Sequence, residues 1–147
     1  MADFVFGADR IYAPFEIDSS NNTLRVTDLG GTDDISVSAD TYYNHLDDSD
    51  SDYPGLLDKL EDALNASSVL AGTYSISSST PDGSELTNSG ITISDSSGGP
   101  FTLEFDHANT TLDPRLLGFA SDASDQTADA EDPAATLDSP YSLWSVW

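Results

Sequence analysis

The chain lacks cysteine and has very few basic residues. With no cysteine in 147 residues, disulfides, thiolate nucleophiles and sulfur-rich metal sites are excluded. The lysines and arginines number four and are widely spaced, whereas nucleic acid or an anionic membrane surface would need a basic patch. Long apolar runs are also missing, and no basic N-terminal region precedes one. We therefore expect no nucleic-acid partner, no membrane partner, no membrane span and no signal peptide.

Acidic residues dominate what is present. The 27 aspartates and glutamates give a formal net charge of −23, and they are spread through nearly every segment. At about 1 M salt the Debye length falls to about 3 Å, so that exposed charges hardly repel one another. The composition therefore predicts a halophilic protein, as in salt-accumulating archaea. An acidic disordered chain is the alternative, but 10% aromatic and 37% hydrophobic residues allow a folded core.

Hydrophobic alternation predicts short strands in the N-terminal third. Apolar residues alternate around Ile11–Ile17, Leu24–Val26 and Ile35–Val37, with turn-forming residues at 19–22 and 29–31 between them. Residues 1–43 are therefore predicted to form a β-meander of three short strands.

One segment has the spacing of a helix. Leucine and alanine recur on one face over residues 54–66, an acidic run precedes them, Pro54 fits the first turn, and Asn65 fits a C-terminal stop. The sequence predicts a single main α-helix at about 54–66.

Alternation returns after the helix. It predicts three antiparallel strands joined by tight turns between residues 72 and 105, with turns at 81–83 and 97–100, and then a compact apolar turn at 112–119. Residues 120–136 are predicted to be an acidic loop or arm, and residues 137–147 an aromatic C-terminal segment. At this length we expect one domain over 1–147. Its expected class is α+β, with a mostly antiparallel β-sheet and the helix packed on it.

Four motifs in the segment from about Tyr43 to Phe119 carry a resemblance. They are the Leu60–Asn65 end of the helix, the run Ile91–Ser94, the run Phe101–Phe105, and the Leu-Leu-Gly-Phe turn Leu116–Phe119. In this order and spacing they resemble a domain of structural proteins from tailed viruses. The resemblance covers about half of the chain. Two departures are the chain end at Trp147 and the length of the acidic segment 121–136.

The resemblance implies assembly rather than catalysis. Together with the acidic composition, it leads us to expect a non-enzymatic virion protein of a haloarchaeal tailed virus, a repeated subunit of the tail, baseplate or neck that is assembled in the host cytoplasm. Its partners would be other copies of itself, in a homo-oligomeric ring, and other virion proteins. Two alternatives stay open: a capsid-surface turret or decoration protein of the same virion, and a cellular halophilic β-rich binding or adhesion module.

The only candidate metal ligands are weak. Asp48, Asp50 and Asp52 have the spacing that opens a calcium-binding loop. Tyr53 stands where that loop needs glycine, however, and Lys59 stands where it needs a bidentate glutamate. A solvated helix entrance is therefore favoured, and no cofactor is expected.

The aromatic end of the chain is the strongest candidate contact surface. Tryptophan and tyrosine are enriched at the buried centres of protein interfaces. The predicted interface residues are Tyr141, Leu143, Trp144, Val146 and Trp147. The alternative is a last strand that packs in the domain's own core.

No catalytic residue is predicted. His45 and His107 are the only histidines, and neither stands beside a plausible nucleophile. Carboxylate pairs are too abundant here to be informative.

Overall fold

The computed structural model describes residues 15–42, 55–78 and 91–140 of the chain. In these residues the predicted α+β class is confirmed, with antiparallel strand pairs and one main α-helix. The elements follow in the order β1 (Phe15–Ile17), β2 (Thr23–Asp28), β3 (Gly31–Ser36), β4 (Asp40–Tyr42), α1 (Leu56–Ala66), β5 (Tyr74–Ser78), β6 (Ile91–Asp95), β7 (Phe101–Leu103), the 3-10 helix η2 (Pro114–Leu117), β8 (Gln126–Ala128) and β9 (Ala135–Asp138).

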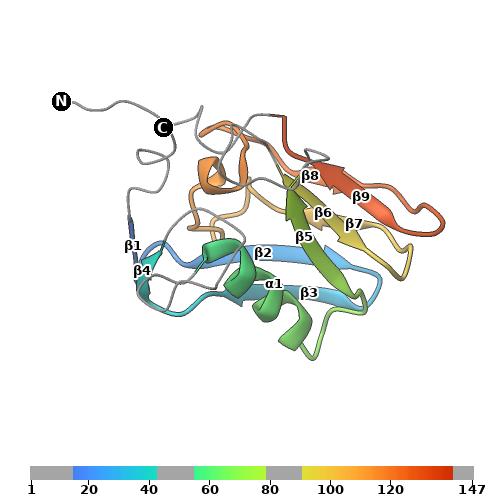
Figure 1. The fold of residues 1–147 in the computed structure, drawn as a ribbon, viewed down its shortest axis with the longest axis horizontal. Helices are drawn as coiled ribbons and strands as arrows, with labels where there is room; N and C mark the ends of the chain where they lie inside the picture. Colours follow the sequence, from blue (N-terminus) through green and yellow to red (C-terminus); the bar gives the residue numbers. More distant parts are fainter. Residues whose placement is uncertain (1–14, 43–54, 79–90, 141–147) are drawn as a thin grey trace.

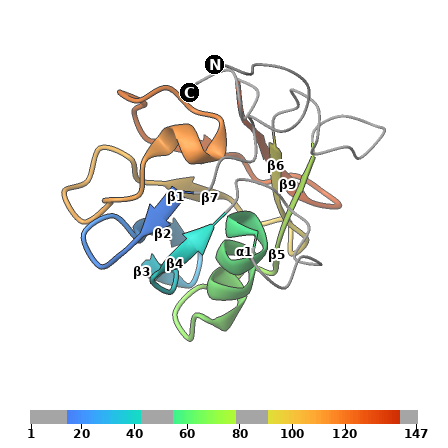
Figure 2. The same cartoon turned by 60° about the vertical axis from the view of Figure 1, so that its left-hand side comes forward.

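The strands form two main sheets around one hydrophobic core (Figure 1). The four-stranded sheet has the order β3-β2-β7-β8, the three-stranded sheet has the order β5-β6-β9, and β1 pairs with β4. Strand β8 contacts β9 on one side, and α1 contacts both β3 and β5 on the other. Figure 2 shows α1 on the side where β3 and β5 lie. The helix therefore closes the core between the two sheets.

Helix α1 confirms the prediction from the leucine spacing. It spans Leu56–Ala66, within the predicted 54–66, and buries Leu56, Leu57, Leu60 and Leu64. Full burial of one leucine side chain is worth about 1.5–3 kcal/mol, so packing of this face is what holds so short a helix. Asn65 does not end the helix but lies in its last turn.

Two predicted strand arrangements are wrong. The β2–β3 hairpin exists, but β1 pairs with β4 rather than with β2, so the described part of the predicted meander, residues 15–42, is not a simple meander. Strands β5 and β6 pair as expected, whereas β7 lies in the other sheet, between β2 and β8. Apolar alternation shows which face of a strand is buried, but it does not identify the neighbouring strand. The predicted turn at 81–83 lies outside the described residues.

The prediction of an acidic loop at 120–136 is wrong for part of that segment. Strand β8 pairs with β7, and β9 begins at Ala135 and pairs with β6. Ala128 and Ala135 are buried, since small side chains fit where β8 and β9 come together. Strand β8 (Gln-Thr-Ala) and strand β9 (Ala-Thr-Leu-Asp) contain too few large apolar side chains to show an alternation that can be recognised.

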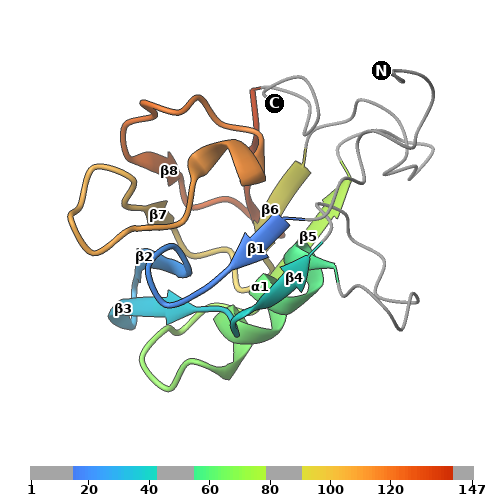
Figure 3. The same cartoon turned by 90° about the vertical axis from the view of Figure 1, so that its left-hand side faces the viewer.

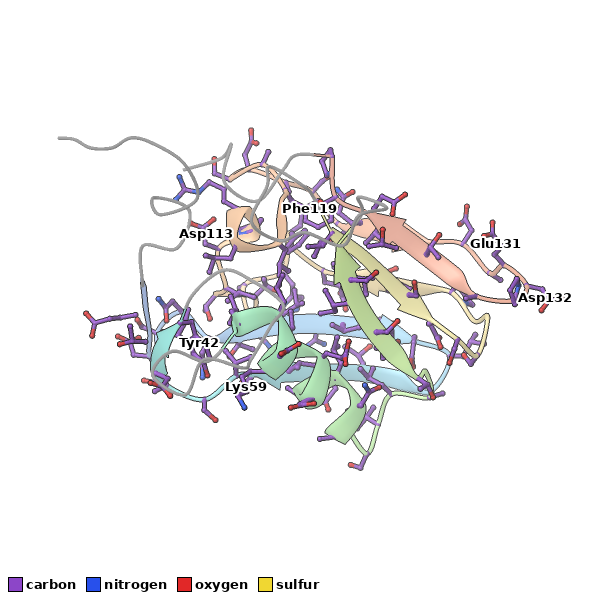
Figure 4. The ribbon with its side chains drawn as sticks, in the orientation of Figure 1. Tyr42, Lys59, Asp113, Phe119, Glu131 and Asp132 are labelled. Atoms are coloured by element: carbon purple, nitrogen blue, oxygen red, sulfur yellow. The ribbon has the colours of Figure 1, made fainter. Side chains whose placement is uncertain are left out.

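The predicted apolar turn at 112–119 is confirmed and is built around η2. The Asp113 carboxylate accepts a hydrogen bond from the Arg115 amide at the start of η2, and Gly118 ends it with a φ of 84°, a left-handed conformation that favours glycine. Leu116, Leu117 and Phe119 are buried. Figure 4 labels Asp113 and Phe119 at this turn.

Candidate functional site

The site residues predicted from the sequence lie outside the described residues. This applies to Asp48, Asp50 and Asp52 and to Tyr141, Leu143, Trp144, Val146 and Trp147, so both sites stay predictions. Within residues 15–42, 55–78 and 91–140, no group of three or more acidic or histidine side chains is placed to hold a metal ion. In the same residues no helix has the length and apolar character to cross a membrane.

Four connecting segments gather at one end of the two main sheets, which we call the loop end. They are the β2–β3 turn at 29–30 and the segments 67–73, 96–100 and 129–134, seen at the right of Figure 1. Backbone contacts join them: the Glu131 amide donates to the Gly98 carbonyl at 3.1 Å. A Cβ atom at Gly30 would lie 2.4 Å from the Val69 carbonyl oxygen, so only glycine allows the first two segments to approach this closely. Figure 4 shows Glu131 and Asp132 at the tip of this end.

The Asp28 carboxylate holds this end together. It accepts hydrogen bonds from the amides of Gly30, Ala71 and Gly72 and from the Tyr74 hydroxyl, at 2.7–3.1 Å. Burial alone would raise the pKa of Asp28, but the Tyr74 hydroxyl and the three amides outweigh it, so the pKa lies below its ordinary value. Asp28 thus stays ionised and fixes the β2–β3 turn onto segment 67–73.

Tyr74 connects this cluster to the core. Its ring packs edge-to-face on Phe101, with the ring centroids 5.4 Å apart. Burial, followed by the hydrogen bond to Asp28, raises the pKa of the Tyr74 hydroxyl, so this group remains a donor. Nearby, the buried Asp95 carboxylate accepts from the amides of Thr73 and Ser97 at 3.0 and 2.9 Å. Each main sheet therefore has one aspartate that fixes the loops at this end.

Leu29 is the most exposed large apolar side chain in the described part of the chain. It is 76% exposed at the tip of the β2–β3 turn, and Val69 on the adjoining segment is 40% exposed. Because Asp28 and Gly30 fix the turn, Leu29 is presented on a rigid support. The local sequence at 29–31 predicts only a turn. A leucine directly before Gly-Gly, where turns are usually polar, was the available signal.

The two described arginines lie beside carboxylates of the same chain. Arg25 is 3.0 Å from the Asp34 carboxylate and 3.6 Å from that of Glu104, and Arg115 is 2.6 Å from Asp113. The Arg25 Nε atom is buried without a hydrogen-bond partner, so the contact with Glu104 is electrostatic only. His107 is exposed, and its Nδ1 accepts from the Asn109 amide.

Several carboxylates accept hydrogen bonds from the chain's own amides and hydroxyls. Glu61 accepts from the Ile76 amide at 2.6 Å, and Asp106 and Asp125 each accept from the other's amide. The described surface thus combines an acidic exterior with a few rigidly held apolar and polar groups. Comparison with known proteins gives no match to a family model, to a curated protein or to a solved structure.

Proposed function

We propose that this chain is a non-enzymatic structural subunit of the virion of a haloarchaeal tailed virus, placed in the tail, baseplate or neck. In this proposal the chain associates with further copies of itself into a homo-oligomeric ring and contacts other virion proteins. The assembly takes place in the host cytoplasm.

The observation that carries the proposal is how the four motifs of the viral resemblance are placed. Each contributes buried side chains to the same hydrophobic cluster. Those side chains are Leu60 and Leu64 of α1, Ile91 and Ile93 of β6, Phe101 and Leu103 of β7, and Leu116, Leu117 and Phe119 at η2. The motifs therefore belong to one packed unit, as expected if they were inherited together.

The charge distribution supports assembly in brine. A net charge of −23 keeps separate copies apart at low ionic strength, and screening at about 1 M salt removes most of that repulsion. Apolar contacts become stronger in concentrated salts that are excluded from protein surfaces. The same surface thus keeps single copies soluble and lets them associate when salt is high.

Localisation in particles tests the virion role. Particles from a host strain that carries the gene would be purified in concentrated salt, and the chain would be located with gold-labelled antibodies in electron micrographs. Label on the tail or neck is expected. Label on the capsid vertices would replace this proposal with the turret or decoration alternative, and absence from particles would overturn the virion role.

A truncation tests the predicted contact segment. Removal of Tyr141–Trp147 should leave a folded chain that no longer forms rings, measured by circular dichroism and light scattering. An unfolded truncated chain would show that the segment belongs to the core, and unchanged rings would show that it is not the contact.

A further inference from the structure

The outward face of the four-stranded sheet is partly exposed in the described residues, and the Asn109 side chain reaches Asp34 on it and donates to the Asp34 carboxylate at 2.9 Å. Figure 3 shows β3, β2, β7 and β8 along one side of the molecule, with α1 and β5 across the core. The opposite face of these strands carries buried residues such as Val26, Ile35 and Leu103. On the outward face the edge-strand side chains of Thr32, Asp34 and Thr127 are exposed.

A row of four threonines crosses this face in register. Thr32 of β3 pairs with Thr27 of β2, Thr27 with Thr102 of β7, and Thr102 with Thr127 of β8. Their hydroxyls bond across the strands at 2.7 Å between Thr27 and Thr32 and at 2.9 Å between Thr102 and Thr127. The Thr27 hydroxyl donates its proton to the Glu104 carboxylate at 2.5 Å. A hydroxyl both donates and accepts, so the row can bind an identical row through its remaining acceptors and the donor left over in the Thr102–Thr127 pair.

The next row carries charges in a fixed order. Arg25 of β2 pairs with Asp34 of β3, and on the other side Glu104 follows β7 and donates its amide to the Arg25 carbonyl at 2.9 Å. The two central positions of this row therefore hold one positive and one negative side chain.

The row at the loop end is apolar. Leu29 continues the alternation of Arg25 and Thr27 along β2 and lies beside Gly99, where an added Cβ would be 3.1 Å from the Leu29 Cδ1. The face as a whole thus has an apolar row, a hydroxyl row and a row whose charges alternate at its centre.

The outward face of the three-stranded sheet lacks two of these features. Ser75 of β5, Ser94 of β6 and Thr136 of β9 lie in register, which gives a comparable hydroxyl row. Strands β5, β6 and β9 contain no lysine or arginine, and they expose no large apolar side chain. Hydroxyls alone therefore do not distinguish the two faces.

We propose that the outward face of the β3-β2-β7-β8 sheet binds the same face of a second copy, with the two-fold axis parallel to the strands. This operation places β2 opposite the partner's β7. Arg25 then faces Glu104 of the partner subunit, and the reciprocal pair forms on the other side of the axis. Thr27 faces Thr102 of the partner subunit. Such an isologous contact needs groups that complement themselves under the two-fold, and this face supplies them.

The face is small. Four strands about 4.8 Å apart and three rows about 7 Å apart cover about 400 Å² per copy, half the area of a standard interface. The pair therefore forms within a larger assembly and at high salt, where the acidic margins are screened. It depends on the self-association that the proposed function requires, and it names the surface that joins two copies.

Three variants of the full chain test this pairing by analytical ultracentrifugation at about 1 M salt. Thr102→Asp places a charge at the centre of the face, and Leu29→Asp places one on a turn where no core packing is lost. Ser94→Asp is the matched control, because Ser94 is also partly buried, on the central strand of the other sheet, and also lies between hydroxyl side chains. Circular dichroism verifies that each variant is folded.

Thr102→Asp and Leu29→Asp are expected to reduce the mass of the assembly to half or less, whereas Ser94→Asp leaves the mass unchanged. Unchanged mass in Thr102→Asp and Leu29→Asp, with a wild type that associates, would overturn the pairing and leave the proposed ring intact. Equal loss in all three variants would also overturn it, because the effect would then be one of charge alone. A wild type that stays monomeric at every salt concentration would overturn both this pairing and the proposed self-association.

Discussion

The two main sheets differ in their exposed parts: the three-stranded sheet has an edge covered by the helix, and the four-stranded sheet has an exposed outward face. The free edge of β5 is bound by α1: the Asn65 side chain accepts from the Tyr74 amide and donates to the Tyr74 carbonyl, both at 2.8 Å, and Glu61 accepts from the Ile76 amide. The four-stranded sheet instead presents Leu29 and the Arg25–Glu104 pair on its outward face. Unpaired edges invite unwanted strand pairing. The molecule thus closes the β5 edge of one sheet with its own side chains, and on the other sheet it leaves the face that we propose binds a second copy.

The largest decrease in the free energy of unfolding is expected when Asp28, which supports the exposed face, is replaced. Asp28→Ala leaves the Tyr74 hydroxyl and three amides without their acceptor, and loss of hydrogen bonds to a charged group costs about 3 kcal/mol. Denaturant unfolding should show this decrease in the free energy of unfolding. Asp18→Ala is the control, because Asp18 is exposed and accepts mainly from Ser20. Equal losses in the two variants would contradict the role given to Asp28.

The closed edge of the three-stranded sheet should be sensitive to Asn65. Asn65→Ala removes both hydrogen bonds to Tyr74 and is expected to lower the free energy of unfolding by about 2 kcal/mol. Asp62→Ala on the exposed side of the same helix should change it little. Faster hydrogen exchange of the Tyr74 amide in Asn65→Ala would locate the loss at the β5 edge. An unchanged exchange rate would rule out this edge contact.

Acid should weaken the loop end of the four-stranded sheet. The pKa of Asp28 is lower in the folded chain than its ordinary value of 3.8, so its ionised form favours folding. This contribution is fully present above the ordinary pKa and is lost as pH falls through the folded-state pKa. Asp28→Asn should therefore show a shallower loss of stability in acid than the wild type. The wild type and Asp28→Asn should be compared at about 1 M salt, where repulsion among the other acids is screened. Parallel curves of stability against pH for the two proteins would contradict this prediction.

A substitution in the charged row should have the smallest effect on the free energy of unfolding. Arg25→Met keeps much of the apolar stem but removes partly exposed ion pairs, which are each worth less than about 1 kcal/mol. Association at high salt should nevertheless weaken about tenfold, since two contacts with the partner's Glu104 are lost. Thermal unfolding and sedimentation measured on the same sample separate the two effects. If Arg25→Met loses stability but associates normally, the charged row stabilises only the single copy and does not contribute to the contact between copies.

Local periodicity was enough to predict some of the fold. The leucine spacing gave α1, and the Gly-Gly pair at 30–31 gave the β2–β3 turn. The partner of β7 could not be predicted, because the residues that select β2 are far away in sequence. Strands β8 and β9 contain too few large apolar side chains to show a period. The roles of Asp28 and Asn65 depend on segments brought together only by folding, so nothing in their local sequence distinguishes them from other turn or helix residues. Leu29 did have a local signal, its place directly before Gly-Gly in a turn, but the rigid support beneath it is formed only by folding.

Light scattering of the purified chain across about 0.2 to 3 M salt tests salt-driven self-assembly most directly. We expect single copies at the low end and a discrete assembly of fixed copy number that forms as salt rises. A strict monomer over the whole range would contradict the account.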